Sequence, residues 1–263
     1  MRRTVRADDG IELAVVEFGG DGPPILLLHG LMGRASTWCA VARWLTTHGR
    51  VVGLDARGHG GSGAAGPWTV ERMVTDAAGA LEALGRATVI GHSMGGLHGI
   101  ALAARHPELV RALVVEDMGV DFRGHSAADA RAWFGALPAV FGSLAEVRAT
   151  FGWPRPEFGE YMAGCVEERA DGYHLLASVE HATQIAAEWA ARDFGALLDD
   201  VRCPALLVEA EQSVAPPGQM AAMAARLPAG RHVRIPGTGH LVHAAAPGAY
   251  RRAVEPFVGV PGS

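Results

Sequence analysis

The sequence predicts an α/β fold with a mostly parallel sheet, and three features indicate this class. Apolar, strand-like runs alternate with longer helical patterns along most of the 263 residues. Runs such as residues 25–28 are apolar throughout, which is typical of parallel strands buried on both faces. The β-branched run at 88–90 passes through a sharp glycine-rich turn into a small-residue, helical stretch at 96–105. We therefore expect strands joined by right-handed crossover helices.

The expected elements follow in chain order. Residues 4–6 and 11–18 flank Asp8-Asp9-Gly10, which predicts a β-hairpin at the start of the chain. Buried strands are expected at residues 25–29, 51–55, 87–90, 113–117, 205–209 and 232–235. Helical patterns occupy residues 70–84, 101–106, 219–227 and 249–258. Together these elements predict an eight-stranded, mostly parallel sheet flanked by helices.

Residues 120–199 interrupt this alternation. They contain no buried-strand signal, and their helical patterns at 128–137, 144–151, 158–169 and 183–189 include aromatic residues. A structureless loop of that length does not belong inside a compact domain. We therefore expect a core domain formed by residues 1–119 and 200–263. Residues 120–199 would be a helical cap over the carboxyl ends of the strands, where open α/β sheets bind ligands.

Residues 91–95 read Gly-His-Ser-Met-Gly, which between a strand and a helix is typical of a nucleophile elbow. A glycine-rich structural turn is the competing interpretation. Ser93 would need a base, and His240 is the candidate, because it follows the last predicted strand in a glycine-rich loop. Capping of the next helix is the alternative role for His240. The backbone N–H groups of Leu31 and Met94 are expected to form an oxyanion hole, with their side chains lining the pocket.

Five segments give the chain, over nearly its full length, a resemblance to the serine esterase branch of the α/β-hydrolase superfamily. They are His29-Gly30-x-x-Gly33, Asp55-Ala56-Arg57-Gly58-His59-Gly60-Gly61-Ser62, the elbow, Ala103-Ala104-Arg105-His106-Pro107-Glu108 and Gly237-Thr238-Gly239-His240. The resemblance implies the α/β-hydrolase fold and a catalytic triad in the chain order serine, acid, histidine. A serine at position 93 argues against the dehalogenase and epoxide hydrolase branches, which use an aspartate there.

The triad acid is the assignment on which this chain departs from the commoner pattern. Most relatives carry an aspartate after the seventh strand, where this chain has Ser213, and a serine cannot stabilise an imidazolium as a buried carboxylate does. Residues 114–119 are similar to the I-D-I-A-P segment of bacterial short-chain acyl esterases, which carry the acid after the sixth strand. The resemblance therefore favours Asp117 and leaves Glu211 and Glu116 as alternatives.

Other polar residues in these segments are expected to have structural roles. His29 is expected to hydrogen-bond its own loop, and His243 to lie on the side of a helix. Arg57 or His59 could contact a substrate. We favour a structural network for both, because Asp–Arg pairs and glycine turns commonly hold such loops in place.

Composition limits the other classes of function. The net charge is −5 without runs of one sign, so neither nucleic acid nor a membrane is an expected partner. The 12 histidines and 3 cysteines show no metal-binding spacing, and the first residues lack the apolar core of a secretory signal. We therefore expect a cytoplasmic monomer or homodimer with no cofactor and no metal.

The residues and the resemblance together predict a serine hydrolase that cleaves a small-molecule carboxylic ester with a small or medium acyl group. Ser93 would attack the carbonyl, His240 would move the proton, and Asp117 would orient His240. Thioester, lactone or amide hydrolysis and C–C bond cleavage use the same parts, so fold analogy does not separate them. A ligand-binding receptor of the same fold is the alternative from a different class.

Overall fold

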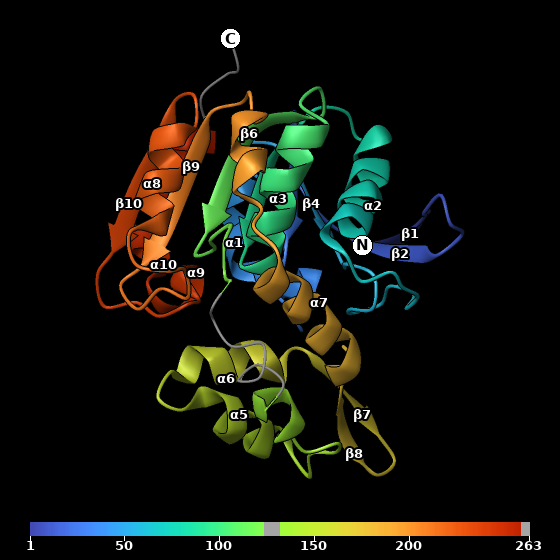
Figure 1. The fold of residues 1–263 in the computed structure, drawn as a ribbon. Coiled ribbons are helices and arrows are strands. Elements are labelled where there is room, and N and C mark those ends of the chain that lie inside the picture. The colour runs from blue at the N-terminus through green and yellow to red at the C-terminus, as the bar shows by residue number, and fades with distance from the viewer. Residues whose placement is uncertain (124–131, 259–263) are drawn as a thin grey trace.

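One large sheet runs through the molecule in the computed structural model, which describes residues 1–123 and 132–258 (Figure 1). Its strands are β1 (Arg2–Arg6), β2 (Glu12–Gly19), β3 (Pro24–Leu28), β4 (Arg50–Leu54), β5 (Ala87–His92), β6 (Val110–Glu116), β9 (Ala205–Ala210) and β10 (Gly230–Ile235). They lie in the order β1-β2-β4-β3-β5-β6-β9-β10. Strand β2 is antiparallel to β1 and β4, and the other neighbours are parallel. The predicted eight-stranded, mostly parallel sheet is confirmed.

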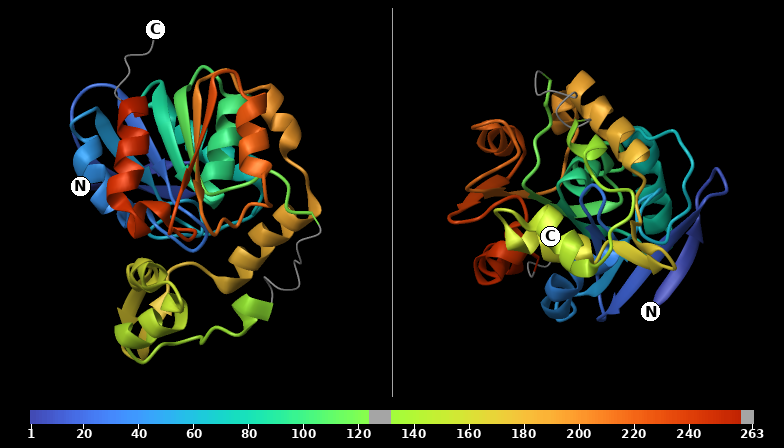
Figure 2. Two further views of the ribbon diagram at one scale, coloured as in Figure 1. Left: turned by 90° about the vertical axis from the view of Figure 1, so that its left-hand side faces the viewer. Right: turned by 90° about the horizontal axis from the view of Figure 1, so that it is seen from below.

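Helices cover both faces of this sheet (Figure 2). They are α1 (Cys39–Leu45) and α10 (Pro247–Val258) on one face, and α2 (Val70–Glu82), α3 (Met94–Arg105) and α8 (Gln219–Arg226) on the other. Successive residues of β3 alternate between the two resulting cores. Leu26 and Leu28 pack with α2 and α3, whereas Ile25 and Leu27 pack with α1 and α10. Burial on both faces explains why the strand is apolar without interruption.

The carboxyl ends of the parallel strands meet at one edge of the sheet. In the strand register, His92 at the end of β5 pairs with Glu116 at the end of β6, and Glu116 pairs with Val208 of β9. The residues that directly follow β5 and β6 are Ser93 and Asp117. The register therefore brings these two residues to the same edge.

A smaller layer of secondary structure lies below this edge in Figure 1. It contains α5 (Leu144–Gly152), α6 (Pro156–Ala163), β7 (Val166–Arg169), β8 (Gly172–Leu175) and α7 (Val179–Ala191). Phe141, Phe151 and Met162 belong to its hydrophobic cluster, which also includes Met32 and Leu241 from loops at the sheet edge. This layer therefore packs on the loops that follow β3 and β10.

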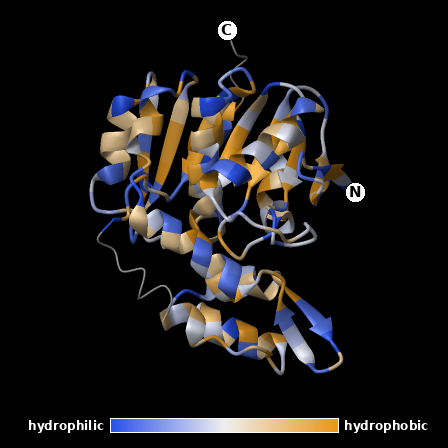
Figure 3. Ribbon diagram, turned by 45° about the vertical axis from the view of Figure 1, so that its right-hand side comes forward, coloured by the Kyte–Doolittle hydropathy of each residue, from blue (hydrophilic) through white to orange (hydrophobic). Residues whose placement is uncertain are grey.

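The helix predicted at residues 158–169 is wrong in its second half. Helix α6 ends at Ala163, and Val166–Arg169 pairs antiparallel with Gly172–Leu175. Both strands are partly exposed and only four residues long, and β7 is mostly hydrophilic (Figure 3). Val166, Tyr173 and Leu175 pack against the hydrophobic cluster of this layer, but so short an apolar alternation does not predict a strand. Gly172 has a φ of +136°, which suits glycine in this turn. The helix predicted at 128–137 lies in part outside the described residues.

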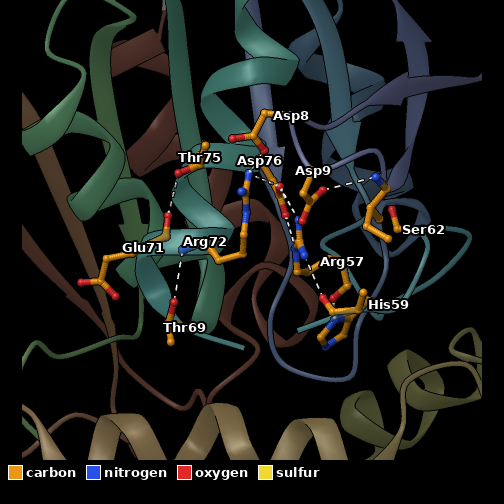
Figure 4. A network of polar contacts seen from close by, with 12 residues as sticks. Asp8, Asp9, Arg57, His59, Ser62, Thr69, Glu71, Arg72, Thr75 and Asp76 are labelled. Atoms are coloured by element: carbon orange, nitrogen blue, oxygen red, sulfur yellow. Dashed lines mark hydrogen bonds and ion pairs between the residues drawn. The ribbon is translucent and has the colours of Figure 1, made fainter. Parts of the chain in front are cut away.

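Buried ion pairs hold the loop after β4 in place (Figure 4). The guanidinium of Arg57 donates to Asp76 of α2 at 2.6 and 2.9 Å, and to Asp9 of the first hairpin at 2.8 Å. Burial acts to lower the pKa of Arg57, but the hydrogen bonds to Asp76 and Asp9 more than offset it and raise the pKa. His59 Nδ1 hydrogen-bonds the carbonyl of Arg57 at 3.0 Å. These contacts support the structural role expected for both residues.

Candidate active site

Ser93 lies in the sharp turn between β5 and α3. Its φ of 52° and ψ of −122° are values that a non-glycine residue adopts only under strain. A Cβ on Gly91 would lie 2.1 Å from the Gly95 oxygen, and a Cβ on Gly95 would lie 2.2 Å from the Leu28 oxygen. Only glycine fits at both positions, so the strand and the helix can pass close together with Ser93 at the apex of the turn.

Backbone strain gathers around this turn. Met32 and Asp117 also have positive φ values, of 62° and 47°. Among the residues that the structure describes, the one other non-glycine residue with positive φ is Ala229. Such strain persists only where surrounding contacts enforce it, and it clusters at functional sites.

His240 and Asp117 are joined by a hydrogen bond at the carboxyl edge of the sheet. Nδ1 of His240 lies 2.7 Å from Oδ2 of Asp117. The Asp117 side chain is completely buried, whereas the His240 side chain, in the loop after β10, is 27% exposed. An ionised carboxylate can only accept a hydrogen bond, so Nδ1 carries a proton, and Nε2 of the neutral ring can accept one. Ser93 and His240 line the same cavity.

The carboxylate of Asp117 accepts further hydrogen bonds from the segment after β9. The N–H groups of Ala210 and Val214 donate to it at 3.0 and 3.2 Å. Burial acts to raise the pKa of Asp117, but the hydrogen bond and charge of His240 outweigh it, with help from the Ser213 hydroxyl and the Ala210 N–H, and the pKa is lowered. Ser213, at the position where most relatives carry the aspartate, therefore helps to keep the Asp117 carboxylate ionised.

The two alternative acids have other partners. Glu211 Oε2 accepts a hydrogen bond from the N–H of Gly237 at 2.7 Å, at the exposed end of β10. Glu116 Oε1 accepts from the main-chain N–H of His243 at 3.0 Å and from its ring Nδ1 at 2.8 Å. Of the three candidate carboxylates, Asp117 is the one that the fold brings to His240.

His243 lies in a helix, as expected, but its surroundings were not predicted. It lies in the short helix α9 (Val242–Ala245), but its ring is buried against Trp38, with ring centroids 4.5 Å apart. Sequence reasoning therefore missed the Glu116–His243 pair. A signal was available in the spacing: two adjacent carboxylates lie at the end of β6, and two histidines lie three residues apart after β10.

The loop after β3 passes close to Ser93. His29 Nδ1 donates to the carbonyl of Gly30 at 2.8 Å, and His29 Nε2 accepts from the N–H of Ala56 at 3.0 Å, so His29 bonds its loop as expected. A Cβ on Gly30 would lie 2.7 Å from His92 Nδ1 and 3.2 Å from Cβ of Ser93. The absence of a side chain at Gly30 lets this main chain approach the elbow.

The side chains of the two expected oxyanion-hole residues point to different places. Leu31 lines the cavity with Ser93, as expected. The expectation that the Met94 side chain also lines the pocket is wrong. Met94 is the first residue of α3, and because α3 packs against α2, its side chain is buried in a cluster with Met73 and Ile185.

A cavity of about 250 Å³ opens at the carboxyl edge of the sheet, between the sheet loops and the layer of residues 132–191. The described residues that line it are mostly apolar or aromatic: Leu31, Met32, His92, Ser93, Met118, Phe122, Trp133, Phe134, Phe158, Tyr161, Met162, Trp189, Val214 and His240. No carboxylate or guanidinium occurs among them. Ser93 and His240 therefore present their polar groups to a mostly apolar chamber.

Two side chains from the smaller layer touch the loops that carry the site. A Cβ on Gly33 would lie 1.9 Å from the hydroxyl oxygen of Tyr161 in α6, so this phenol fills the space beside the loop after β3. Arg155 Nη1 donates to the carbonyl of Gly237 at 3.2 Å, in the loop that leads to His240. The layer that roofs the cavity is thus coupled to both loops.

Two kinds of site are not found in the described part of the chain. Histidine, cysteine and carboxylate side chains form no group of three or more there that could hold a metal ion. Among the same residues, no helix combines the length and the apolar character that a membrane span requires.

Residues 25–253 match the sequence model of the Alpha/beta hydrolase family. The match covers most of the chain and agrees with the sheet order and the elbow described above. The chain therefore belongs to the α/β-hydrolase family.

Several proteins similar to this chain are named as hydrolases. It is 30% identical over 254 residues to "Putative carbamate hydrolase RutD" from Azorhizobium caulinodans, which covers 92% of this chain and 94% of the relative. Among solved structures, E-2-(acetamidomethylene)succinate hydrolase superposes with a TM-score of 0.87 at 25% identity, covering 99% of this chain and 100% of that one. A thermophilic esterase from Thermogutta terrifontis superposes with a TM-score of 0.77 at 27% identity, with 98% of each chain covered.

Proposed function

We propose that this protein is a serine hydrolase that cleaves a carboxylic ester with a small or medium acyl group, through a triad of Ser93, His240 and Asp117. One observation carries this proposal. The ring of His240 is bound to the buried Asp117 at 2.7 Å and faces a cavity that Ser93 also lines. A nucleophile, a base and a group that orients the base are the parts that acyl transfer requires.

In this mechanism, His240 Nε2 takes the hydroxyl proton of Ser93 as the serine oxygen attacks the substrate carbonyl. Asp117 keeps the proton on Nδ1 and stabilises the positive ring that forms. The N–H groups of Leu31 and Met94 donate to the oxyanion of the tetrahedral intermediate. His240 then returns the proton to the leaving alcohol, which leaves an acyl-serine. Water, deprotonated by the same ring, releases the acid and regenerates Ser93.

The lining of the cavity supports a preference for neutral, apolar acyl groups. Its volume of about 250 Å³ is near the small end of ligand sites, which typically measure about 300–1,000 Å³. A charged acyl group would lose its hydration there without gaining an opposite charge from the described lining residues. We infer that residues 120–199 act as a cap on a core of residues 1–119 and 200–263, and that Phe158 and Trp189 help to select the acyl group.

Hydrolysis of a C–N bond is the second candidate. The names of two similar proteins contain a carbamate and an acetamido compound, in which the acyl carbon is bonded to nitrogen. The same triad serves both reactions, and His240 would protonate the leaving nitrogen. Matched butanoate ester, butanamide and butyl carbamate substrates separate the two candidates by their kcat/KM values.

The decisive test of the nucleophile is covalent labelling. We expect a fluorophosphonate to modify Ser93, and Ser93→Ala to lower kcat for a butanoate ester by several orders of magnitude, about 10³-fold or more. Ser143→Ala serves as the control, because Ser143 only caps α5. Mass spectrometry locates the adduct. An adduct on another residue, or an active Ser93→Ala enzyme, would contradict the proposal.

A further inference from the structure

The Glu116–His243 pair is a second histidine–carboxylate pair, immediately beside the first. Glu116 precedes Asp117 at the end of β6, and His243 follows His240 by three residues. We propose that Glu116 and His243 are positioning residues, which hold the His240 loop against β6 so that the base stands at the correct distance from Ser93. This inference rests on the proposed function, in which His240 is the base.

Glu116 is joined to the His243 segment by both main-chain and side-chain bonds. The N–H of His243 donates to Oε1 at 3.0 Å, and ring Nδ1 lies 2.8 Å from Oε1 and 2.9 Å from Oε2. The Glu116 side chain has no exposed surface and that of His243 is 4% exposed. A buried carboxylate is costly unless donors surround it, so the loop gains stability by presenting His243 at this place.

The main chain of Glu116 is also bonded to the nucleophile. Its carbonyl oxygen accepts a hydrogen bond from the N–H of Ser93 at 2.9 Å. One residue therefore contacts Ser93 through its backbone and the His240 loop through its side chain. Because both bonds converge on the rigid end of β6, they set the separation of nucleophile and base.

Two neighbouring rings also contact the same loop. The His243 ring stacks on Trp38, with 4.5 Å between ring centroids and 27° between ring planes. His92, the residue before Ser93, has its Nε2 3.0 Å from the main-chain oxygen of His240, and because a carbonyl only accepts, Nε2 donates. The His240 loop is thus fastened at the main chain of His240 and again at His243. The reactive ring itself is bonded to Asp117 and packs against the His92 ring, with 4.6 Å between ring centroids.

The expected consequence of loosening this attachment is a loss of turnover with little loss of substrate binding. A misplacement of about 1 Å in a catalytic group can cost about 10²-fold in rate. His243→Leu removes the ring donor and keeps an apolar side chain against Trp38. We expect kcat per folded enzyme to fall by about 10- to 100-fold, with KM within about threefold of the wild type.

Rescue by a conservative variant separates positioning from general stability. In His243→Asn, the side-chain amide can donate to Glu116 from near the place of Nδ1, so kcat should return to within about fivefold of the wild type. Val254→Ala is the control, because Val254 is buried in the same core cluster as Trp38 but bonds nothing in the loop. It should lower the melting temperature without changing kcat per folded enzyme.

The outcomes distinguish this inference from the proposed function. If Ser93 is labelled and Ser93→Ala is inactive, but His243→Leu turns over at the wild-type rate per folded enzyme, then the positioning role is wrong and the proposed function stands. If His243→Asn is as impaired as His243→Leu, the hydrogen bond to Glu116 is not what positions the loop. An active Ser93→Ala enzyme overturns both proposals.

Discussion

Two adjacent histidine–carboxylate pairs, His240–Asp117 and His243–Glu116, have nearly the same geometry and very different surroundings. The bond between His240 and Asp117 measures 2.7 Å, and the shortest contact between His243 and Glu116 measures 2.8 Å. The His240 side chain is 27% exposed and lines the cavity, whereas that of His243 is 4% exposed and stacks on Trp38. The pair itself therefore does not determine a chemical role. The ring of His240 can transfer a proton because it lines the cavity. The buried ring of His243 instead suits a role in holding its loop in place.

Histidines without a carboxylate form a third group that sharpens this contrast. His59, His92 and His98 each have a buried ring nitrogen without a hydrogen-bond partner among the described residues. Burial lowers the pKa of His59 and of His98 to about 3, and that of His92 well below its usual value. These rings are neutral near pH 7, because no buried negative charge favours their protonation.

The largest effect should come from breaking the exposed pair. Asp117→Asn keeps the shape of the side chain but removes its charge and permits the wrong tautomer of His240. We expect kcat to fall by about 10³- to 10⁴-fold with little change in KM. Glu211→Gln is the matched control, and it should cost less than about tenfold, because the Glu211 side chain bonds the N–H of Gly237 rather than the ring of His240. Steady-state kinetics on one ester measure both variants, and a reversed order would make Glu211 the acid.

A smaller effect should come from transferring the carboxylate from position 117 to position 213. The hydroxyl of Ser213 hydrogen-bonds Asp117 and helps to lower its pKa. Because Asp117 bonds His240, a carboxylate at position 213 would lie close to the same ring. We expect Asp117→Asn combined with Ser213→Asp to recover about tenfold or more of the kcat lost in Asp117→Asn alone. Ser213→Asp by itself is the control, since two close carboxylates disfavour each other's charge. No recovery in the double variant would mean that position 213 cannot orient His240.

The smallest change should be in the pH dependence of stability, through an unpaired histidine. Folding lowers the pKa of His98 from about 6.5 to about 3, so below pH 6.5 the unfolded chain binds more protons. The free energy of unfolding should therefore fall as the pH drops from 6.5 towards 3. His98→Leu should reduce the slope of the unfolding free energy against pH by at most about 1.4 kcal/mol per pH unit, which is the value for one proton.

Urea unfolding at several pH values measures that slope. His106→Asn is the control, because His106 lies at the more exposed end of the same helix. An equal slope in wild type and His98→Leu would show that His98 does not contribute to acid sensitivity.

Local patterns in the sequence were sufficient for the sheet and the elbow. Strands β3, β5 and β9 begin and end within two residues of the predicted bounds, because burial on both faces leaves an uninterrupted apolar run. The turn at Ser93 was equally readable, since a Cβ at Gly91 or Gly95 would collide with neighbouring backbone. The resemblance to serine esterases supplied Asp117 as the preferred acid, but the residues alone left three carboxylates open.

The tertiary structure decided which carboxylate meets which histidine. Glu116 and Asp117 are neighbours in the chain, yet their side chains go to different histidines, because β6 ends between them and Asp117 turns with a φ of 47°. The hairpin β7–β8 was decided in the same way, by pairing between two four-residue strands that are too short for their apolar residues to predict them. A sequence orders the candidate residues along the chain, but side-chain directions depend on backbone angles and on distant partners that only the folded chain brings together.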